Sequence, residues 1–316
     1  MTHRATPSWR IVIAAALLGA PGCASPKQKQ FPSPDAAAQS LVDALRSHDK
    51  ERLRQALGPA GDDITSSGDP VSDRADAARF LSLYDARHRI QSEQNGVSTL
   101  LVGDDEWPFP VPIKKSDRGY VFDTASGREE ILNRRVGRNE LSAEQVCLAI
   151  ADAQREYVRR RPMGGDLPEY ARKIASDPGT KNGLYWQTAE GEEPSPLGPL
   201  VASATAEGYA SSPRPYHGYH YRLLTAQGPH ADGGATDYLV NGRLLGGFAI
   251  VAYPAQYGNS GIMTFMTNHD GIVYQRDLGP DTEKLAKRVV EFDPGPGWTR
   301  IDDTTVDDTS LAGEGR

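Results

Sequence analysis

The sequence predicts an α+β protein built of two units, and three observations support that prediction. With 316 residues the chain exceeds the usual size of one domain, and 38% of its residues are hydrophobic, enough for two cores. Its N-terminal half combines helical apolar spacing with short β segments, which predicts helices plus a small sheet. Its C-terminal half opens with one long helical pattern and continues with β segments joined by short turns, which predicts a long helix packed on an antiparallel β-meander.

Residues 1–23 have the layout of an export signal. Two positive charges, Arg4 and Arg10, precede an apolar stretch at 11–18, and small residues lead to Cys23. This end resembles a bacterial lipoprotein signal, so we expect cleavage before Cys23 and lipid on that cysteine. Plain secretion and an uncleaved cytoplasmic chain are the alternatives. Since no Asp follows Cys23, resemblance to the known sorting preference favours an outer-membrane lipoprotein facing the periplasm.

The first unit is expected to span residues 31–138, after a polar tether at 24–30. Ser33 is the expected N-cap of a first helix, and Asp49 is the expected N-cap of a second. The second helix is expected to end at Gly58, which can take the left-handed conformation. The remaining expected elements are a helix from about Ser72, strands at 97–102 and 119–122, a Pro-rich edge segment at 107–112 and a closing helix at 128–135.

The second unit is expected to span residues 139–301. It begins with a helix over 139–160, whose apolar residues recur at three- and four-residue spacing. A last helix is expected near Asp281, with Leu285 turned inward. Residues 302–316 are acidic and poor in large apolar side chains, so we expect a disordered tail.

A meander of short strands is expected between these two helices. Asn241 and Gly242 form the dipeptide best suited to a type I′ hairpin turn. The segment 248–253 is apolar on both faces, which predicts a central strand. The other expected strands lie at 216–224, 237–240, 243–245, 262–266 and 272–275.

Charge and cysteine content exclude some classes of protein. The chain has 35 basic and 42 acidic side chains, a net charge of −7, which argues against a dedicated nucleic-acid-binding protein. Its one apolar run, at the N-terminus, is shorter than the about 20 residues of a membrane-spanning helix, which excludes a polytopic membrane protein. Lipid on Cys23 would leave Cys147 unpaired, and the apolar neighbours of Cys147 predict a buried, inert thiol.

Distinctive short blocks recur along the chain, among them FPSP at 31–34, SGDPV at 67–71, DDEWPFP at 104–110, GLYW at 183–186 and SPLGPL at 195–200. Together these blocks resemble a bacterial envelope family that is catalogued as a domain of unknown function, number 2950. The resemblance runs from about residue 31 to residue 300. It implies no particular activity, because the family has no established one.

A weaker similarity concerns the C-terminal half. A long helix followed by β segments such as 248–254 and 269–273 is similar to the globular heads of bacterial pilin-like and pseudopilin-like proteins. Pilins carry an assembly helix at the N-terminus, whereas another unit precedes the helix here. The similarity therefore implies a surface for docking other proteins, and not assembly into a pilus.

Acidic and aromatic side chains adjoin in one short segment. Asp104, Asp105 and Glu106 directly precede Trp107 and Phe109. Aromatic residues are enriched at recognition surfaces, so we expect Trp107 and Phe109, with the cleft between the units, to form a binding surface. A solvated turn is the ordinary interpretation of the three acids. The sequence thus favours a noncatalytic binding or assembly role, with the membrane and an envelope protein as partners.

The alternative is a periplasmic hydrolase or carbohydrate-binding enzyme. In that interpretation the acids at 104–106 act with His220 or His269 as general acid and base. The sequence contains no serine nucleophile elbow, phosphate loop or dinucleotide fingerprint, and its histidines lack metal-ligand spacing. We therefore expect neither a cofactor nor a metal, and the sequence leaves the oligomeric state open.

Overall fold

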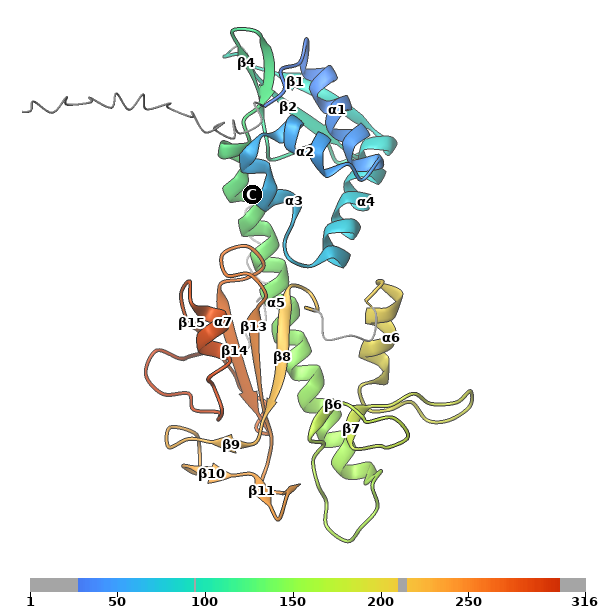
Figure 1. Cartoon of the computed structure of the whole chain (residues 1–316), viewed down its shortest axis with the longest axis vertical. Coiled ribbons are helices and arrows are strands. Elements are labelled where there is room, and N and C mark those ends of the chain that lie inside the picture. The colour runs from blue at the N-terminus through green and yellow to red at the C-terminus, as the bar shows by residue number, and fades with distance from the viewer. Residues whose placement is uncertain (1–27, 94, 210–214, 302–316) are drawn as a thin grey trace, which may run out of the picture.

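Two α+β units are joined by one long helix in the computed structural model, which describes residues 28–93, 95–209 and 215–301 (Figure 1). The N-terminal unit comprises residues 28–123, and the C-terminal unit comprises residues 161–301. Helix α5 (Thr124–Arg160) passes from one unit into the other. The predicted α+β class is confirmed. The export signal, Cys23 and the acidic tail lie outside the described residues.

The helices of the N-terminal unit begin where the sequence provides caps. Ser33 and Asp49 each accept a backbone hydrogen bond from the first turn that follows, as predicted. Gly58 adopts a φ of +74° at the end of the second helix. Asp69 caps a helix that begins at Pro70, slightly before the predicted start. The helices are α1 (Pro34–Arg46), α2 (Lys50–Leu57), the 3₁₀ turn η1 (Pro59–Gly61), α3 (Asp62–Thr65) and α4 (Pro70–Ala86).

A five-stranded antiparallel sheet completes the N-terminal unit. Its order is β1-β2-β4-β5, and β3 pairs with β2. The prediction found β2 and β5 but missed β1 and β4, whose mainly polar sequences, HRIQS and IKKS, hide the β pattern. Apolar side chains of the helices pack on the sheet around Leu41 and Phe122 and around Val42 and Leu100. The strands are β1 (His88–Ser92), β2 (Val97–Val102), β3 (Trp107–Pro108), β4 (Ile113–Ser116) and β5 (Gly119–Phe122).

Helix α5 is continuous over 37 residues, about 55 Å at 1.5 Å per residue. The prediction of two separate helices, at 128–135 and 139–160, was wrong. Gly137 lies between these two ranges, but it is exposed and costs only about 1 kcal/mol relative to Ala in a helix. Buried residues such as Val136 and Ala143 continue on both sides of it, so packing against the two units outweighs that cost.

The C-terminal unit is centred on a five-stranded antiparallel sheet of order β16-β15-β14-β13-β8. Every residue of β13 is buried, and β13 pairs with a strand on each side, which confirms the predicted central strand. The strands are β8 (Tyr219–Leu224), β13 (Ala249–Pro254), β14 (Met263–Asn268), β15 (Val273–Asp277) and β16 (Thr299–Arg300).

Smaller elements surround this sheet. Asn241 and Gly242 both have positive φ, +51° and +76°, as the predicted type I′ turn requires. Leu285 is 38% exposed, so its predicted inward position was wrong; its neighbour Ala286 is buried instead. The segment between α5 and β8, where the sequence analysis predicts no helix, contains α6 (Gly198–Ala206). The other elements are β6 (Lys173–Ala175), β7 (Gly183–Tyr185), β9 (Ala226–Gln227), β10 (Thr236–Asp237), β11 (Leu239–Val240), β12 (Arg243–Leu244) and α7 (Thr282–Ala286).

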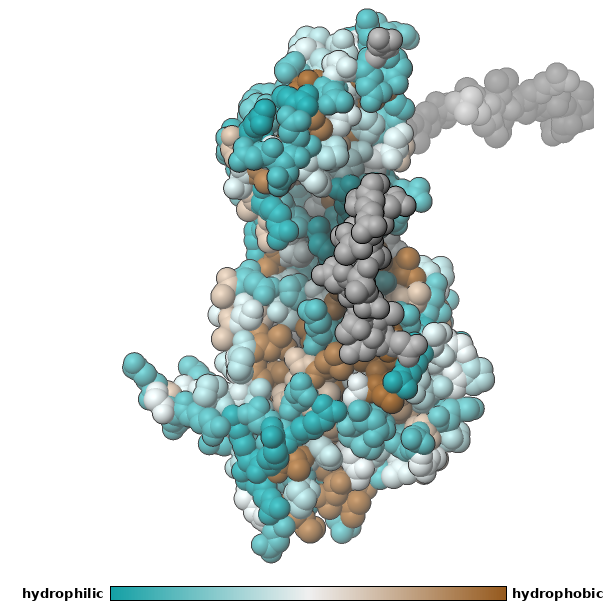
Figure 2. Space-filling model, turned by 180° about the vertical axis from the view of Figure 1, so that it is seen from behind, coloured by the Kyte–Doolittle hydropathy of each residue, from teal (hydrophilic) through white to brown (hydrophobic). Residues whose placement is uncertain are grey.

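The core of the C-terminal unit lies between α5 and the sheet. Val146, Ile150 and Tyr157 of α5 join Phe265 and other strand residues in one buried cluster, so the predicted helical stripe is confirmed. Cys147 is fully buried there, and burial raises its pKa to about 12, as expected of an inert thiol. On the face seen in Figure 2, apolar residues gather mainly on this larger unit.

Candidate functional site

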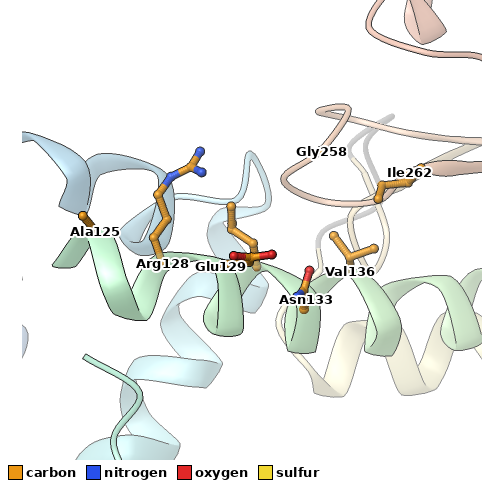
Figure 3. Close-up of a pocket in the computed structure, with 8 residues that line it drawn as sticks. Ala125, Arg128, Glu129, Asn133, Val136, Gly258 and Ile262 are labelled. Carbon is orange, nitrogen blue, oxygen red and sulfur yellow. The ribbon is translucent and has the colours of Figure 1, made fainter. Parts of the chain in front are cut away.

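A groove lies where α5 passes between the two units, and we call it the junction groove (Figure 3). It has a volume of about 280 Å³. Leu132 and Val136 of α5 and Ile262 of the C-terminal unit provide apolar surface, and Arg128, Glu129 and Asn133 provide polar groups. Arg128 is engaged by Asp63 of the N-terminal unit, at 2.5 Å. The full lining is Ala125, Arg128, Glu129, Leu132, Asn133, Val136, Gly258 and Ile262.

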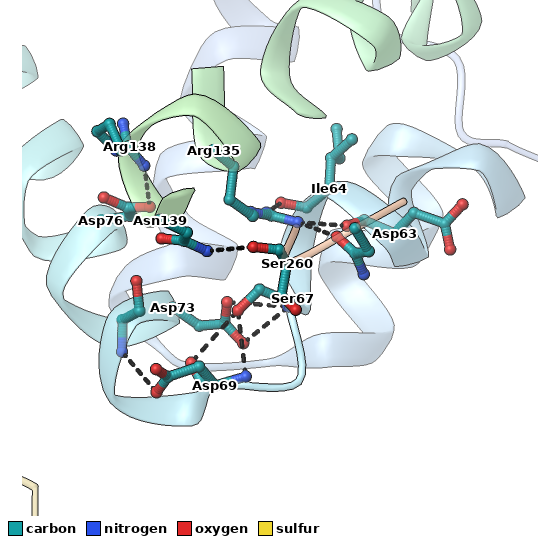
Figure 4. A network of polar contacts seen from close by, with 12 residues as sticks. Asp63, Ile64, Ser67, Asp69, Asp73, Asp76, Arg135, Arg138, Asn139 and Ser260 are labelled. Carbon is teal, nitrogen blue, oxygen red and sulfur yellow. Dashed lines mark hydrogen bonds and ion pairs between the residues drawn. The ribbon is translucent and has the colours of Figure 1, made fainter. Parts of the chain in front are cut away.

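A network of buried polar contacts holds the two units together beside this groove (Figure 4). Arg135 of α5 donates to the backbone oxygens of Asp63 and Ile64, at 2.9 and 2.6 Å, and also to the side chain of Asn259. The first two partners belong to the N-terminal unit and the third to the C-terminal unit. One nearly buried guanidinium therefore bonds both units at once.

Asp69 makes a second connection between the units. One carboxylate oxygen accepts from the backbone at the start of α4, and the other accepts from the Tyr209 hydroxyl at 2.7 Å and the Gly218 amide at 3.1 Å. The carboxylate is 1% exposed, so all four donors matter for its solvation. Burial, and then the bond to Asp69, raise the pKa of Tyr209 well above its usual value, which keeps this phenol a donor.

Burial also shifts the pKa values of two charged groups in the network, Asp73 and Arg135. The pKa of Asp73 is raised, mainly because the carboxyl is buried; hydrogen bonds from Ser67 and the charge of Arg135 act against this shift. Burial lowers the pKa of Arg135, and the nearby carboxylates of Asp73 and Asp76 oppose that change. The two groups thus compensate each other's cost of desolvation.

The predicted acids at 104–106 lie in the turn between β2 and β3. Asp104 and Asp105 are exposed. Glu106 accepts two bonds from Arg89, at 2.8 and 2.6 Å, and lies 3.5 Å from Arg87. The bonds from Arg89 hold the pKa of Glu106 below its usual value. These contacts favour the ordinary interpretation, a solvated turn held by ion pairs.

The two candidate histidines lie apart from these acids and from each other. His220 pairs with Tyr253 at one end of β13, and burial lowers its pKa. His269 follows Asn268, which pairs with Ala249 at the other end of β13. Four residues of strand separate the two ends, about 13 Å. The acids belong to the other unit, so the structure does not assemble the predicted catalytic set.

The two predicted surface aromatics differ in exposure. Trp107 is 37% exposed, and the Arg134 guanidinium of α5 lies over its ring at 5.0 Å. Phe109 is partly buried and packs on Phe80 and Phe122 at the edge of the core, with ring centroids 5.2 and 6.4 Å away. Neither aromatic lines the junction groove. Replacing Phe109 would therefore disturb the core as well as a surface.

The start of the described chain is fastened to the N-terminal unit. The Gln28 side chain donates to the backbone oxygens of Ala56 and Phe122, at 3.0 and 2.8 Å. The Lys29 amide donates to the Gln55 carbonyl at 2.8 Å. The last residues of the predicted tether are thus part of the fold, because side-chain and backbone partners hold them. Cys23, the predicted lipidation site, lies outside the described residues.

In the part of the chain that the structure describes, no helix is both long and apolar enough to cross a membrane. In the same ranges, no three or more His, Cys, Asp or Glu side chains gather as they would around a metal ion.

Sequence reasoning missed the residues that join the units. Neither Arg135 nor Asn259 is among the candidate residues of the sequence analysis. One signal was present: Arg135 shares a helical face with Leu132, Val136 and Asn139, at spacings of three and four residues. A charged residue on a buried face requires a partner, but the sequence does not say which one.

Comparison with known proteins adds one match. Residues 28–301 match the family described as "Protein of unknown function (DUF2950)". No curated protein sequence and no solved structure matches the chain.

Proposed function

The chain belongs to the DUF2950 family, whose function is unknown, and we propose that it has a binding role. In this proposal the protein is exported to the bacterial envelope, held to the membrane by lipid on Cys23, and binds a partner without catalysing a reaction. The observation that carries the proposal is the junction groove. It combines an apolar floor with polar groups on its rim, and residues of both α5 and the C-terminal unit build it.

A noncatalytic role is supported by the placement of the candidate acids and bases. Glu106 is committed to Arg89, and the candidate histidines lie at opposite ends of β13. A general acid and a general base must both reach one substrate bond, within hydrogen-bond distance of the proton that each transfers. These side chains do not meet that requirement.

A short anchor is supported by the position of Gln28. Gln28 lies five positions after Cys23, and five extended residues span at most about 18 Å. Because Gln28 is fastened to the N-terminal unit, lipid on Cys23 would hold that unit close to the membrane. The similarity of the C-terminal half to pilin-like heads supports a protein as the partner.

The proposal is tested by crosslinking in the cells that produce the protein, followed by affinity capture and mass spectrometry. Asn133→Trp fills the junction groove from an exposed position of α5. Gln145→Trp adds the same bulk at another exposed position of α5, outside the groove, and is the matched control. Cys23→Ala removes the proposed anchor, and Trp107→Ala tests the predicted aromatic surface.

We expect one envelope protein to be captured in near-stoichiometric amounts. Asn133→Trp should reduce its capture at least tenfold, and Gln145→Trp should leave it within twofold. Cys23→Ala should release the chain from the membrane fraction. Equal capture by the two tryptophan variants would refute the groove, and loss of capture in Trp107→Ala alone would assign the partner to the aromatic surface instead.

A further inference from the structure

A second hollow, separate from the junction groove, lies in the N-terminal unit between α1, the end of α4 and the strands β1 and β2. We call it the acceptor pocket. Its volume is about 310 Å³. The residues that line it are Asp35, Ala36, Ala38, Gln39, Tyr84, His88, Ile90 and Leu100.

The floor and one wall of the acceptor pocket are apolar and aromatic. Ala38 and Leu100 are buried in the core beneath it. The rings of Tyr84 and His88 stack face to face, with centroids 3.7 Å apart and an angle of 9° between the planes. Tyr84 is buried, whereas His88 is exposed. A bound molecule can therefore place an apolar group against the exposed ring of His88, which Tyr84 supports from behind.

The hydrogen-bond donors around the pocket are already engaged. The His88 Nδ1 lies 2.8 Å from the Tyr84 carbonyl oxygen, which can only accept, so Nδ1 donates and Nε2 is left as an acceptor in the neutral ring. The Tyr84 hydroxyl donates to Gln39 Oε1 at 3.5 Å, and Gln39 Nε2 donates to Asp43 at 2.8 Å. The polar atoms that remain free to bind a ligand in this pocket are therefore mainly acceptors.

The local charge is negative. Asp35 makes no hydrogen bond or ion pair through its carboxylate within the described residues, so both of its oxygens are available. The charged groups that act on the Tyr84 hydroxyl are the carboxylates of Asp35, Asp43 and Asp85 and the guanidinium of Arg46. Asp35 is the one acid among the residues that line the pocket, and none of them is Lys or Arg.

We propose that the acceptor pocket binds a small organic cation: a primary ammonium or guanidinium group carried on an apolar chain or ring. Such a group brings donors only, which matches a site whose free atoms are acceptors. Its charge pairs with the Asp35 carboxylate, and charge-assisted hydrogen bonds are stronger than neutral ones. Its apolar part lies against the exposed ring of His88 and the partly exposed Ile90, above the buried Ala38 and Leu100.

The proposal is tested by titration calorimetry on the full chain with three probes of similar shape. Phenethylammonium carries the proposed charge, 2-phenylethanol is neutral and phenylacetate is negative. Phenethylguanidinium is a fourth probe, which distinguishes the two cations. Asp35→Asn removes the charge, and Asp105→Asn changes the net charge equally at an exposed site outside the pocket.

We expect saturable binding of at least one cation and none of the neutral or negative probe. Asp35→Asn should weaken that binding at least tenfold, and Asp105→Asn should leave it within twofold. His88→Ala should weaken it less than Asp35→Asn, because it removes one ring and no charge. Circular dichroism confirms that each variant is folded. Failure of both cations to bind, equal binding of phenylacetate, or unchanged binding in Asp35→Asn would each overturn the proposal.

Discussion

The core of the C-terminal unit and the junction between the units are held together in different ways. In the core, α5 packs on the sheet through apolar side chains such as Ile150 and Phe265. At the junction, the units meet through a guanidinium, a carboxylate and amide groups, chiefly Arg135, Asp69 and Asn259. Apolar packing is largely non-directional, whereas hydrogen bonds require particular distances and angles. The core therefore supplies stability, and the junction sets how one unit is placed against the other.

The apolar core and the polar junction also differ in how much stability a mutation removes. An apolar core loses stability in proportion to the atoms removed and the cavity left behind. A buried polar network is favourable only when each member keeps its partners, because an unpaired buried charge or carbonyl is costly. The following three variants separate these two modes, beginning with the largest expected effect.

Phe265→Ala tests the apolar core. Phe265 is 2% exposed, and its ring lies 5.7 Å from that of Tyr219. Truncating a buried Phe leaves a cavity, so the free energy of unfolding should fall by about 3–5 kcal/mol. Urea unfolding followed by circular dichroism measures this change. Leu141→Ala, at an exposed apolar position of α5, is the control and should change stability by less than about 1 kcal/mol.

Arg135→Ala tests the junction. It leaves the carbonyls of Asp63 and Ile64 without their donor and the Asp73 carboxyl without its nearest cation. The free energy of unfolding should fall by about 2–4 kcal/mol. Calorimetry should then show the two units unfolding in separate transitions, because their main connection is lost.

The neighbouring residue provides the control for this prediction. Arg134 contacts Glu130 and the exposed ring of Trp107, and both contacts are on the surface. Arg134→Ala should therefore cost less than about 1 kcal/mol. Equal losses in the two variants would mean that the junction network contributes no more than an ordinary surface contact.

Asp73→Asn has the smallest expected effect, and its sign depends on pH. Burial raises the pKa of Asp73 in the folded protein above its value in the unfolded chain, near 3.8. The protonated carboxyl therefore contributes its full stability to the fold below about pH 3.8, and this contribution is lost as pH rises through the folded pKa. Asn does not titrate. The variant should therefore gain stability relative to the wild type between about pH 3 and pH 7. Urea unfolding at both pH values measures the difference.

For Asp62→Asn, the stability relative to the wild type should change with pH in the opposite direction. The bond from Arg54 lowers the pKa of Asp62, so its contribution is present above the unfolded value and lost as pH falls. That variant should lose stability relative to the wild type as pH rises. The same sign for both variants would contradict the assignment of Asp73.

Much of the fold follows from local sequence. The caps at Ser33 and Asp49, the turn at Asn241 and the central strand β13 were predictable because each depends on a few adjacent residues. The strand β4 was not, because its residues are mainly polar and pairing with β2 and β5 stabilises it. The continuity of α5 was not predictable either, since packing against both units overrides the propensity of Gly137.

The candidate sites were less predictable than the fold. The junction groove is lined by residues near position 130 and by residues near position 260. No local pattern in the sequence predicts that these two segments lie side by side. The acids at 104–106 were candidate site residues because they are adjacent in the sequence. Glu106, however, accepts a hydrogen bond from Arg89, which lies 17 residues before it in the chain. Adjacency in sequence predicts a turn or a cap, whereas a binding site depends on which distant segments the topology brings together.

The continuity of α5 has a geometric consequence for how this chain tolerates change in length. Each residue of an α-helix advances by 1.5 Å and turns by about 100°. Inserting one residue near Gly137 would rotate the two units against each other by that angle, and Arg135 would no longer reach Asn259. Insertions in the loop of residues 162–168 carry no such penalty. The number of residues in α5 is therefore constrained, because it sets the rotation of one unit relative to the other. We expect family members to vary in the lengths of their loops and to keep the length of this helix.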